Sequence, residues 1–111
     1  MKAYVPKKGD FIAVTFDPQS GHEQKGRRPA LVVSNTLFND QTGLAIVCPL
    51  TTTDRGYPFH VPVTDNPRVK GFVMAEQVKS LDYRARQAKA IGEASNDLLD
   101  EVLSILDACI Y

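Results

Sequence analysis

Apolar residues in this chain recur with two different periods, and the change between them falls near residue 95. Before that point the apolar residues alternate with polar ones or cluster in short runs, and Gly, Pro and polar turns separate the runs. Between residues 98 and 110 they recur three or four positions apart. The first pattern is typical of β-strands and the second of an amphipathic helix. We therefore expect five or six short strands that form a partly open barrel, followed by one terminal helix.

The first predicted strand covers residues 10–16, where Ile12, Val14 and Phe16 share one face of an alternating segment. Side chains of a strand point alternately to its two faces, so this pattern indicates a half-buried strand. Further strands are expected at residues 29–34, 44–50, 59–63, 71–80 and 88–91.

Proline and glycine set expectations at several of these segments. The run 44–50 is the most apolar strand candidate, and Pro49 is expected to mark its end or a bulge, because proline cannot donate to a strand ladder. Residues 59–63 indicate an edge strand. A short helical turn is expected around Phe38, and Gly43 suits a backbone position with positive φ.

The terminal helix is expected to begin after Ser95 or Asn96 as its N-cap. Asp97 then lies near the positive end of the helix dipole, where a carboxylate is favourable. The apolar stripe is wide for so small a protein, so we expect it to pack against the sheet, with a partner subunit as an additional neighbour. The stripe consists of Leu98, Leu99, Val102, Leu103, Ile105, Leu106, Cys109 and Ile110.

Composition bounds the class of protein. A length of 111 residues predicts a single domain over 1–111, and a hydrophobic fraction of 43% with 23% charged residues argues against disorder. No apolar run approaches the roughly 18–20 residues that span a bilayer, and the charged N-terminus is not followed by an apolar segment, so neither a membrane span nor a signal peptide is expected. Cys48 and Cys109 resemble buried thiols rather than a disulfide or metal framework, which fits a reducing cytosol.

The net charge of zero hides an asymmetry along the chain. The segment 91–111 holds five acidic residues and no Lys or Arg, so residues 1–90 carry 13 basic and 8 acidic side chains, a net of +5. Such a charge permits polyanion binding if the basic side chains cluster on one face. A solvated surface explains the same charge equally well.

Two polar loops follow predicted strands and carry candidate binding groups. Residues 21–28 contain two glycines and three cations just before Pro29, and Arg presents a planar fork of donors that matches phosphate oxygens. Residues 51–59 offer three threonine hydroxyls for phosphate oxygens, with Tyr57 or Phe59 available to stack on a base. A charged hairpin and a Thr-rich strand end are the alternative explanations of the two loops.

Other chemistries find little support. His22 and His60 are the only histidines and lie on separate segments, without the clustered ligands of a metal site, so no metal site is expected. Glycine patterns of nucleotide-binding loops are absent, and neither cysteine lies in a polar loop near a histidine. Each histidine is better explained as a surface residue than as a general base, although His22 stays a secondary candidate because it shares a loop with Arg28.

Seven short motifs occur in order along nearly the whole chain. They are Gly9-Asp10, Phe16-Asp17-Pro18, Gly21-His22-Glu23-Gln24, Gly26-Arg27-Arg28-Pro29, Pro49-Leu50-Thr51-Thr52, Gly56-Tyr57-Pro58-Phe59 and Glu76-Gln77-Val78-Lys79-Ser80-Leu81-Asp82. Each motif is weak alone, but the seven together at this spacing resemble the MazF/PemK family of type II toxin–antitoxin toxins.

This resemblance implies a fold, an activity and partners. The implied fold is mainly β (α+β), a small SH3-like, partly open barrel of five to seven strands with a C-terminal amphipathic helix. The implied activity is metal-independent, sequence-specific cleavage of single-stranded RNA, including mRNA, which inhibits translation and uses no cofactor. The implied partners are a cognate antitoxin and a second copy of the chain in a cytoplasmic homodimer.

The resemblance also implies which residues act on RNA. The catalytic pair of the family is an Arg directly before the Pro that starts the second strand and a Thr just after the strand that ends in Pro, which correspond here to Arg28 and Thr51. Glu23 matches the acidic residue of the first loop, to which a supporting catalytic role is given. The expected RNA-binding side chains are His22, Gln24, Lys25, Arg27, Thr52, Thr53, Tyr57, Gln77 and Lys79.

These residue types suit RNA cleavage by internal attack, which needs the 2′-hydroxyl deprotonated, the phosphoryl oxygens stabilised and the 5′-oxygen protonated. We expect Arg28 to bind the scissile phosphate and Thr51 to hydrogen-bond a phosphoryl oxygen. Glu23 and His22 stay open as alternative bases. Lys25 and Arg27 are expected to supply steering charges.

Two rival functions share the predicted fold. One is a toxin that poisons DNA gyrase; that branch depends on a C-terminal end containing Trp, whereas this chain has no Trp and ends Ala108-Cys109-Ile110-Tyr111. The other is a non-catalytic RNA- or protein-binding module that uses the same groove. Incubation with single-stranded RNA and EDTA separates the three, because only the nuclease produces fragments.

Overall fold

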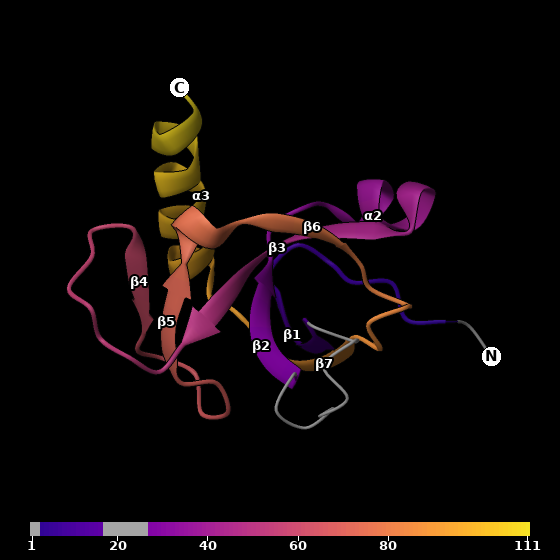
Figure 1. The fold of residues 1–111 in the computed structure, drawn as a ribbon, viewed down its shortest axis with the longest axis horizontal. Helices are drawn as coiled ribbons and strands as arrows, with labels where there is room; N and C mark the ends of the chain where they lie inside the picture. The colour runs from indigo at the N-terminus through magenta and orange to yellow at the C-terminus, as the bar shows by residue number, and fades with distance from the viewer. Residues whose placement is uncertain (1–2, 17–26) are drawn as a thin grey trace.

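The computed structural model describes residues 3–16 and 27–111, and a seven-stranded antiparallel sheet dominates this part of the chain (Figure 1). The strands are β1 (Asp10–Thr15), β2 (Arg27–Val32), β3 (Leu44–Thr51), β4 (His60–Val63), β5 (Gly71–Met74), β6 (Lys79–Asp82) and β7 (Lys89–Glu93). The helical elements are α2 (Thr36–Thr42), the short 3-10 helix η1 (Ala75–Gln77) and α3 (Asn96–Ile110). The expectation of a mainly β fold with a C-terminal helix is confirmed.

Strand β3 organises the sheet, whose order is β4-β5-β3-β2-β1-β7, with β6 also paired to β3. The first half of β3 pairs with β6, where Leu44 lies opposite Asp82, and its end pairs with β5, where Leu50 lies opposite Val73. Because β3 serves two partners in succession along one edge, the sheet bends around it into a half-barrel (Figure 1). Strand β4 is at the edge of the sheet, as its sequence predicts.

The single strand expected over residues 71–80 is wrong, because η1 divides this segment into β5 and β6. Ala75 is buried at the break and donates its N–H to the Phe59 carbonyl (3.1 Å), while the Val78 N–H closes the turn on the Ala75 carbonyl (3.2 Å). These contacts redirect the chain after β5, which pairs with the end of β3, so that β6 pairs with the beginning of β3. The apolar composition of residues 71–80 indicates that the segment is buried. It does not indicate that the segment divides into two strands that pair with different parts of β3.

Pro49 does not end β3, which continues to Thr51. It pairs with Ala30 of β2 on one side. On the other side it lies between the last pair with β6, Val47 opposite Lys79, and the first pair with β5, Leu50 opposite Val73. A residue without an N–H is tolerated in this central strand because it lies where the partner changes.

Two apolar clusters occupy the two faces of the sheet. The barrel cluster lies inside the half-barrel and consists of Ile12, Val14, Ala30, Val32, Ala45, Val47, Leu81 and Tyr83. The helix-side cluster consists of Phe11, Leu31, Val33, Cys48, Leu50, Val61, Val69, Val73, Ala75, Leu98, Val102 and Leu106.

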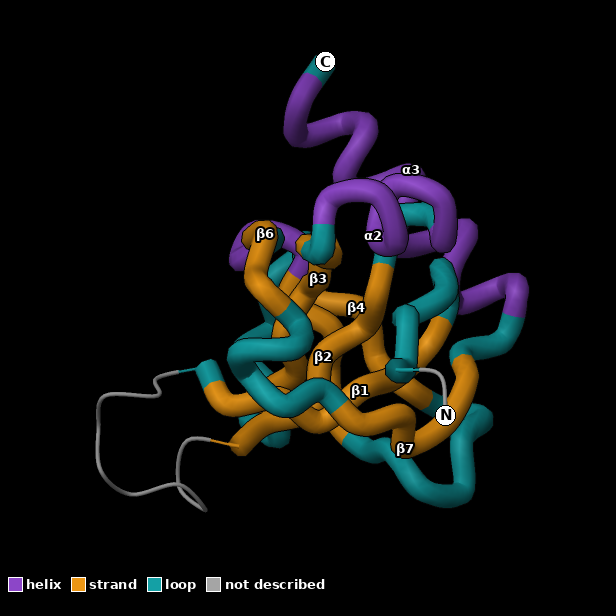
Figure 2. The backbone as a smooth tube through the Cα atoms, turned by 90° about the vertical axis from the view of Figure 1, so that its right-hand side faces the viewer, coloured by secondary structure: helices purple, strands orange, loops and turns teal. Residues whose placement is uncertain are grey.

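Helix α3 covers the helix-side cluster. In Figures 1 and 2 both helices are drawn above the strands, but α2 lies apart from α3, where Tyr83 of the barrel cluster donates to it. The N-cap of α3 is Ser95, whose Oγ accepts from the Leu98 N–H (3.1 Å), which confirms the predicted start. Leu98, Val102 and Leu106 are buried, which confirms that this part of the apolar stripe packs on the sheet, whereas Cys109 and Ile110 at its end are exposed. No helix in the part of the chain that the structure describes is long and apolar enough to cross a membrane.

Helix α2 is anchored by a buried polar network around Asn39. Asn39 is fully buried; its Nδ2 donates to the carbonyls of Pro6 (2.8 Å) and Ser34 (3.1 Å), and its Oδ1 accepts from Ser34 Oγ (2.5 Å). The Tyr83 hydroxyl donates to the Asn39 carbonyl (2.8 Å). Gly43 ends the helix with φ of 74°, as expected from the sequence.

The two cysteines differ in their surroundings. Cys48 is buried in β3, as predicted, but Cys109 is exposed near the end of α3, so its predicted burial is wrong. Burial, together with the negative charge of Glu76, raises the pKa of the Cys48 thiol to about 12.

Candidate functional site

Arg28 and Thr51 lie on the two sides of a fork in the sheet. Strand β2 pairs with β3 from Val32 as far as Ala30, which lies opposite Pro49. The pairing of these two strands ends there, and Arg28 and Thr51 each lie two residues beyond this last pair. At this level Arg28 pairs with β1 and Thr51 pairs with β5, so the two strands have parted, as the diverging arrows of β2 and β3 show in Figure 1.

The two side chains of the fork belong to the same face of the sheet. Alternation along β2 places Arg28 on the face of Ala30, and alternation along β3 places Thr51 on the face of Val47. Both Ala30 and Val47 belong to the barrel cluster. Arg28 is exposed and Thr51 is half-buried, so an exposed cation and a partly exposed hydroxyl lie on the two strands that part at the fork.

The Thr51 hydroxyl is held in a defined orientation. Its Oγ1 accepts a hydrogen bond from the Thr53 N–H (3.1 Å), so the hydroxyl proton is available to donate to a ligand. Close packing holds the backbone of Thr51 from the other side. Gly71 has φ of +114°, and a Cβ at this position would collide with the Thr51 carbonyl oxygen, so only glycine permits this approach of β5.

Lys79 adds a second cation to this end of the barrel. It is opposite Val47 and therefore belongs to the same face as Thr51. Its Nζ lies 5.1 Å from the centre of the Phe16 ring, just past the end of β1, which is a cation–π contact. Arg28 pairs with Val14, two residues before Phe16, so Lys79 and Arg28 extend toward the same end of the half-barrel.

The loop after Thr51 is exposed and carries aromatic side chains. Residues 52–59 are all exposed, with 51% of Tyr57 and 43% of Phe59 accessible to solvent. The Tyr57 ring packs against His60 with a centroid distance of 5.0 Å. Flat exposed rings of this kind are the groups on which single-stranded bases stack.

His60 is not the surface residue that the sequence indicates. Its side chain is 3% exposed, and its Nε2 lies 2.8 Å from Oε2 of Glu76 in η1. Its Nδ1 is buried without a hydrogen-bond partner among the described residues. His60 thus connects the Tyr57 loop to η1, which carries the exposed Gln77. The sequence signal for the burial of His60 is its inward-facing position on an edge strand.

Arg27 makes more hydrogen bonds within the fold than expected for a side chain that only attracts RNA by its charge. Its Nη1 donates to Thr15 Oγ1 (3.2 Å), and its Nη2 donates to the carbonyls of Ala13 (3.0 Å) and Gln87 (2.9 Å). The remaining predicted site residues, His22, Glu23, Gln24 and Lys25, lie outside the described residues. No cluster of three His, Cys, Asp or Glu side chains suited to a metal occurs in residues 3–16 and 27–111.

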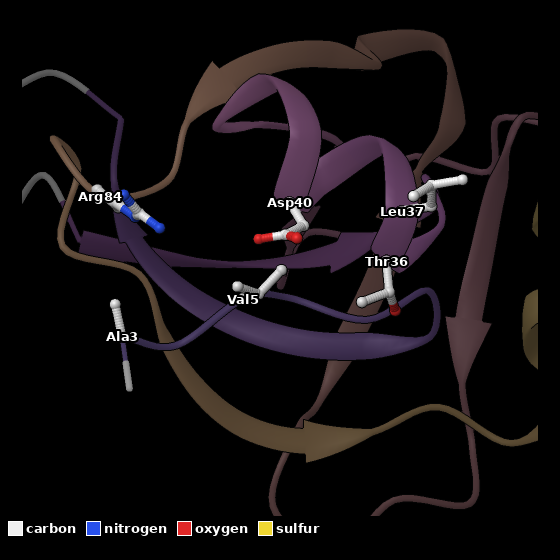
Figure 3. Close-up of a pocket in the computed structure, with 6 residues that line it drawn as sticks. All are labelled: Ala3, Val5, Thr36, Leu37, Asp40 and Arg84. Carbon is white, nitrogen blue, oxygen red and sulfur yellow. The ribbon is translucent and has the colours of Figure 1, made fainter. Parts of the chain in front are cut away.

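A separate pocket of about 690 Å³ lies at the opposite end of β3 (Figure 3). It is lined by Ala3, Val5, Thr36, Leu37, Asp40 and Arg84. Asp40 and Arg84 point toward each other across the pocket in Figure 3. None of the residues predicted to act on RNA lines it.

The fold is that of a small β half-barrel protein with a C-terminal helix, and comparison with known proteins identifies the family. Residues 7–110 match the model of the PemK-like, MazF-like toxins of type II toxin–antitoxin systems. The chain is 41% identical over 107 residues to the endoribonuclease toxin MazF of Escherichia coli K12, with 96% of each chain covered. It is 42% identical over 109 residues to the endoribonuclease toxin ChpB of the same strain, covering 94% of this chain and 93% of ChpB.

Solved structures agree with this assignment. MazF of Deinococcus radiodurans superposes with a TM-score of 0.87 at 44% identity, covering 97% of this chain and 98% of that one. MazF in a MazE–MazF complex of the same organism gives a TM-score of 0.86 at 39% identity, with 97% of both chains covered. The chain therefore belongs to the PemK-like, MazF-like toxins of type II toxin–antitoxin systems.

Proposed function

We propose that this protein is an endoribonuclease toxin that cleaves single-stranded RNA, including mRNA, and so inhibits translation. The observation that supports the proposal is the fork, where Arg28 on β2 and Thr51 on β3 lie just beyond the last pair of these strands, Ala30 opposite Pro49. Relatives that match 94–96% of this chain at 41–42% identity are endoribonucleases.

The geometry supports cleavage by internal attack of the 2′-hydroxyl on the adjacent phosphate. The Arg28 guanidinium offers paired N–H donors to the phosphoryl oxygens and neutralises the charge that builds on them. The Thr51 hydroxyl, oriented by the Thr53 N–H, donates to one of the same oxygens. The base that takes the 2′-proton is Glu23 or His22, and Arg28 is the candidate donor of a proton to the leaving 5′-oxygen.

The bound RNA strand is proposed to run across the exposed surface beside the fork. Lys79 contributes charge at the end of the barrel, and Tyr57 offers a stacking surface. Thr52, Thr53 and Gln77 are exposed around them and are proposed to contact the RNA strand. Single-stranded bases leave their edges free, so these contacts are where sequence selection is expected.

The proposed partners of the protein are inferred from the same family assignment. We propose that the single domain of residues 1–111 acts as a homodimer in the cytoplasm and is inhibited by a cognate antitoxin. Residues 1–90 carry a net charge of +5, which suits an acidic antitoxin segment that competes with RNA for the same surface. MazE–MazF complexes among the structural relatives support this assignment.

The test compares Arg28→Ala with a matched control, Arg84→Ala, on single-stranded RNA in the presence of EDTA. Arg84 is an exposed arginine at the other end of β3, so its removal changes the net charge equally without touching the fork. The wild type and Arg84→Ala should produce RNA fragments, whereas Arg28→Ala should cleave roughly 100–1,000-fold more slowly with an unchanged Tm. RNA binding without fragments from the wild type would instead indicate a non-catalytic module.

A further inference from the structure

We infer that Arg27 is a positioning residue that fixes the start of β2, so that the neighbouring Arg28 is presented to the fork. This inference rests on the proposed function and assigns Arg27 a role other than binding phosphate. Arg27 is half-buried, whereas Arg28 is exposed. Successive residues of a strand point to opposite faces, so a firmly held Arg27 sets the direction in which Arg28 projects.

The guanidinium of Arg27 is bonded to two separate parts of the fold. Thr15 Oγ1 and the Ala13 carbonyl, both of β1, lie 3.2 and 3.0 Å from its terminal nitrogens. The Gln87 carbonyl, in the turn before β7, lies 2.9 Å away. Hydrogen bonds to a charged donor are stronger than neutral ones, and three of them fix both the position and the plane of the group.

The acceptors of Arg27 are themselves held in place. The Thr15 N–H donates to the Arg86 carbonyl (3.1 Å), and Arg86 Nη1 donates to the Thr15 (3.1 Å) and Phe16 carbonyls. Gln87 has a positive φ of 55°, which is unfavourable for a side chain larger than glycine and is maintained by the surrounding turn. Its N–H donates to the Arg84 carbonyl (3.1 Å) within that turn. Arg27 is therefore bonded to residues that make further hydrogen bonds within the fold.

The start of β2 needs such an anchor because the fork removes one of its neighbours. Ala30 and Leu31 pair with both β1 and β3, whereas Arg27 and Arg28 pair with β1 alone. A strand end with one neighbour has fewer interactions to resist fraying. Three side-chain hydrogen bonds from Arg27 compensate at the level where Arg28 must meet the phosphate.

The test uses Arg27→Lys, which keeps the charge but lacks the planar guanidinium group that reaches three acceptors. If Arg27 positions Arg28, kcat for RNA cleavage should fall by on the order of 10- to 100-fold while KM stays nearly unchanged, because misplacing a catalytic group by about 1 Å has an effect of this size. The salt dependence of RNA binding should also stay unchanged. A comparison variant, Lys79→Met, should instead reduce the slope of log affinity against log salt by about 0.7.

A second variant keeps the inference testable if Arg27→Lys fails to fold. Thr15→Val removes one acceptor of Arg27, keeps a β-branched side chain in β1 and alters no charge. It should lower kcat by roughly 3- to 10-fold, the effect of one hydrogen bond. Unchanged kcat in Thr15→Val, or a raised KM with normal kcat in Arg27→Lys, would overturn the inference. A wild type that does not cleave RNA would instead refute the proposed function.

Discussion

The two ends of β3 differ: one lies beside a buried polar network, and the other is partly exposed and lies at the proposed catalytic groups. At the Leu44 end, α2 and the β6 turn surround Asn39, whose polar side-chain atoms are all hydrogen-bonded and buried. At the Thr51 end, β2 departs, the following loop is exposed, and Arg28 and Lys79 bring positive charge. Substitutions at the two ends should therefore affect different measurements.

The largest effect is expected from Asn39→Ala, at the Leu44 end. This change leaves the Pro6 carbonyl, the Ser34 carbonyl and the Ser34 hydroxyl without their partner in a buried site. The free energy of unfolding should fall by about 3–5 kcal/mol, measured by urea denaturation. Asp40→Ala, at the adjacent exposed position, is the control and should change stability by less than about 0.5 kcal/mol.

Thr51→Val, at the other end of β3, should reduce RNA cleavage and leave stability nearly unchanged. It preserves the shape of the side chain but removes the hydroxyl, so RNA cleavage should slow roughly 100-fold, equivalent to about 2.7 kcal/mol of transition-state stabilisation. The urea midpoint should change little because Thr51 is only half-buried. Thr51→Ser retains the donor and should retain most activity; a Thr51→Val variant as active as Thr51→Ser would show that the hydroxyl has no catalytic role.

Tyr83→Phe is a smaller change at the Leu44 end. It keeps the buried ring in the barrel cluster but removes the hydrogen bond to the Asn39 carbonyl. Stability should fall by about 1–2 kcal/mol, with the cleavage rate per folded molecule unchanged. A loss of cleavage comparable to that of Thr51→Val would show that the two ends are coupled and would contradict the separation proposed above.

The smallest effect is expected from thiol alkylation. Alkylation requires the thiolate, and the pKa of Cys48 is raised to about 12, so this thiol stays protonated at pH 8 and gains thiolate character only as the pH approaches that value. Cys109 is exposed. Iodoacetamide at pH 8 should therefore label Cys109 alone, detected by mass spectrometry, and leave RNA cleavage intact. Labelling of Cys48 in the native protein would contradict its burial.

Local patterns were sufficient to predict β1, the edge strand β4 and the capped helix α3. Each depends on alternation, turn residues or a cap that lies within the segment itself. The division of residues 71–80 was not predictable in this way, because it depends on where the distant strand β3 changes its partner.

The same limit applies to the candidate site. Sequence motifs predicted Arg28 and Thr51 as site residues, and the structure places them on the two strands that part beyond the pair of Ala30 and Pro49. The motifs did not reveal that Arg27 is bonded within the fold, because its partner Gln87 is 60 residues away. They also missed the burial of His60, which depends on its contact with Glu76 across the break at η1.

The contact between Gly71 and Thr51 has a consequence for how the protein loses its activity. Any side chain at position 71 would displace the strand that supports Thr51, although residue 71 itself contacts no proposed substrate. In a selection for cells that survive expression of the toxin, escape mutations should therefore accumulate at codon 71 as well as at codons 28 and 51. Such variants would leave both proposed catalytic side chains in the sequence and yet be as harmless to the host as loss of Arg28.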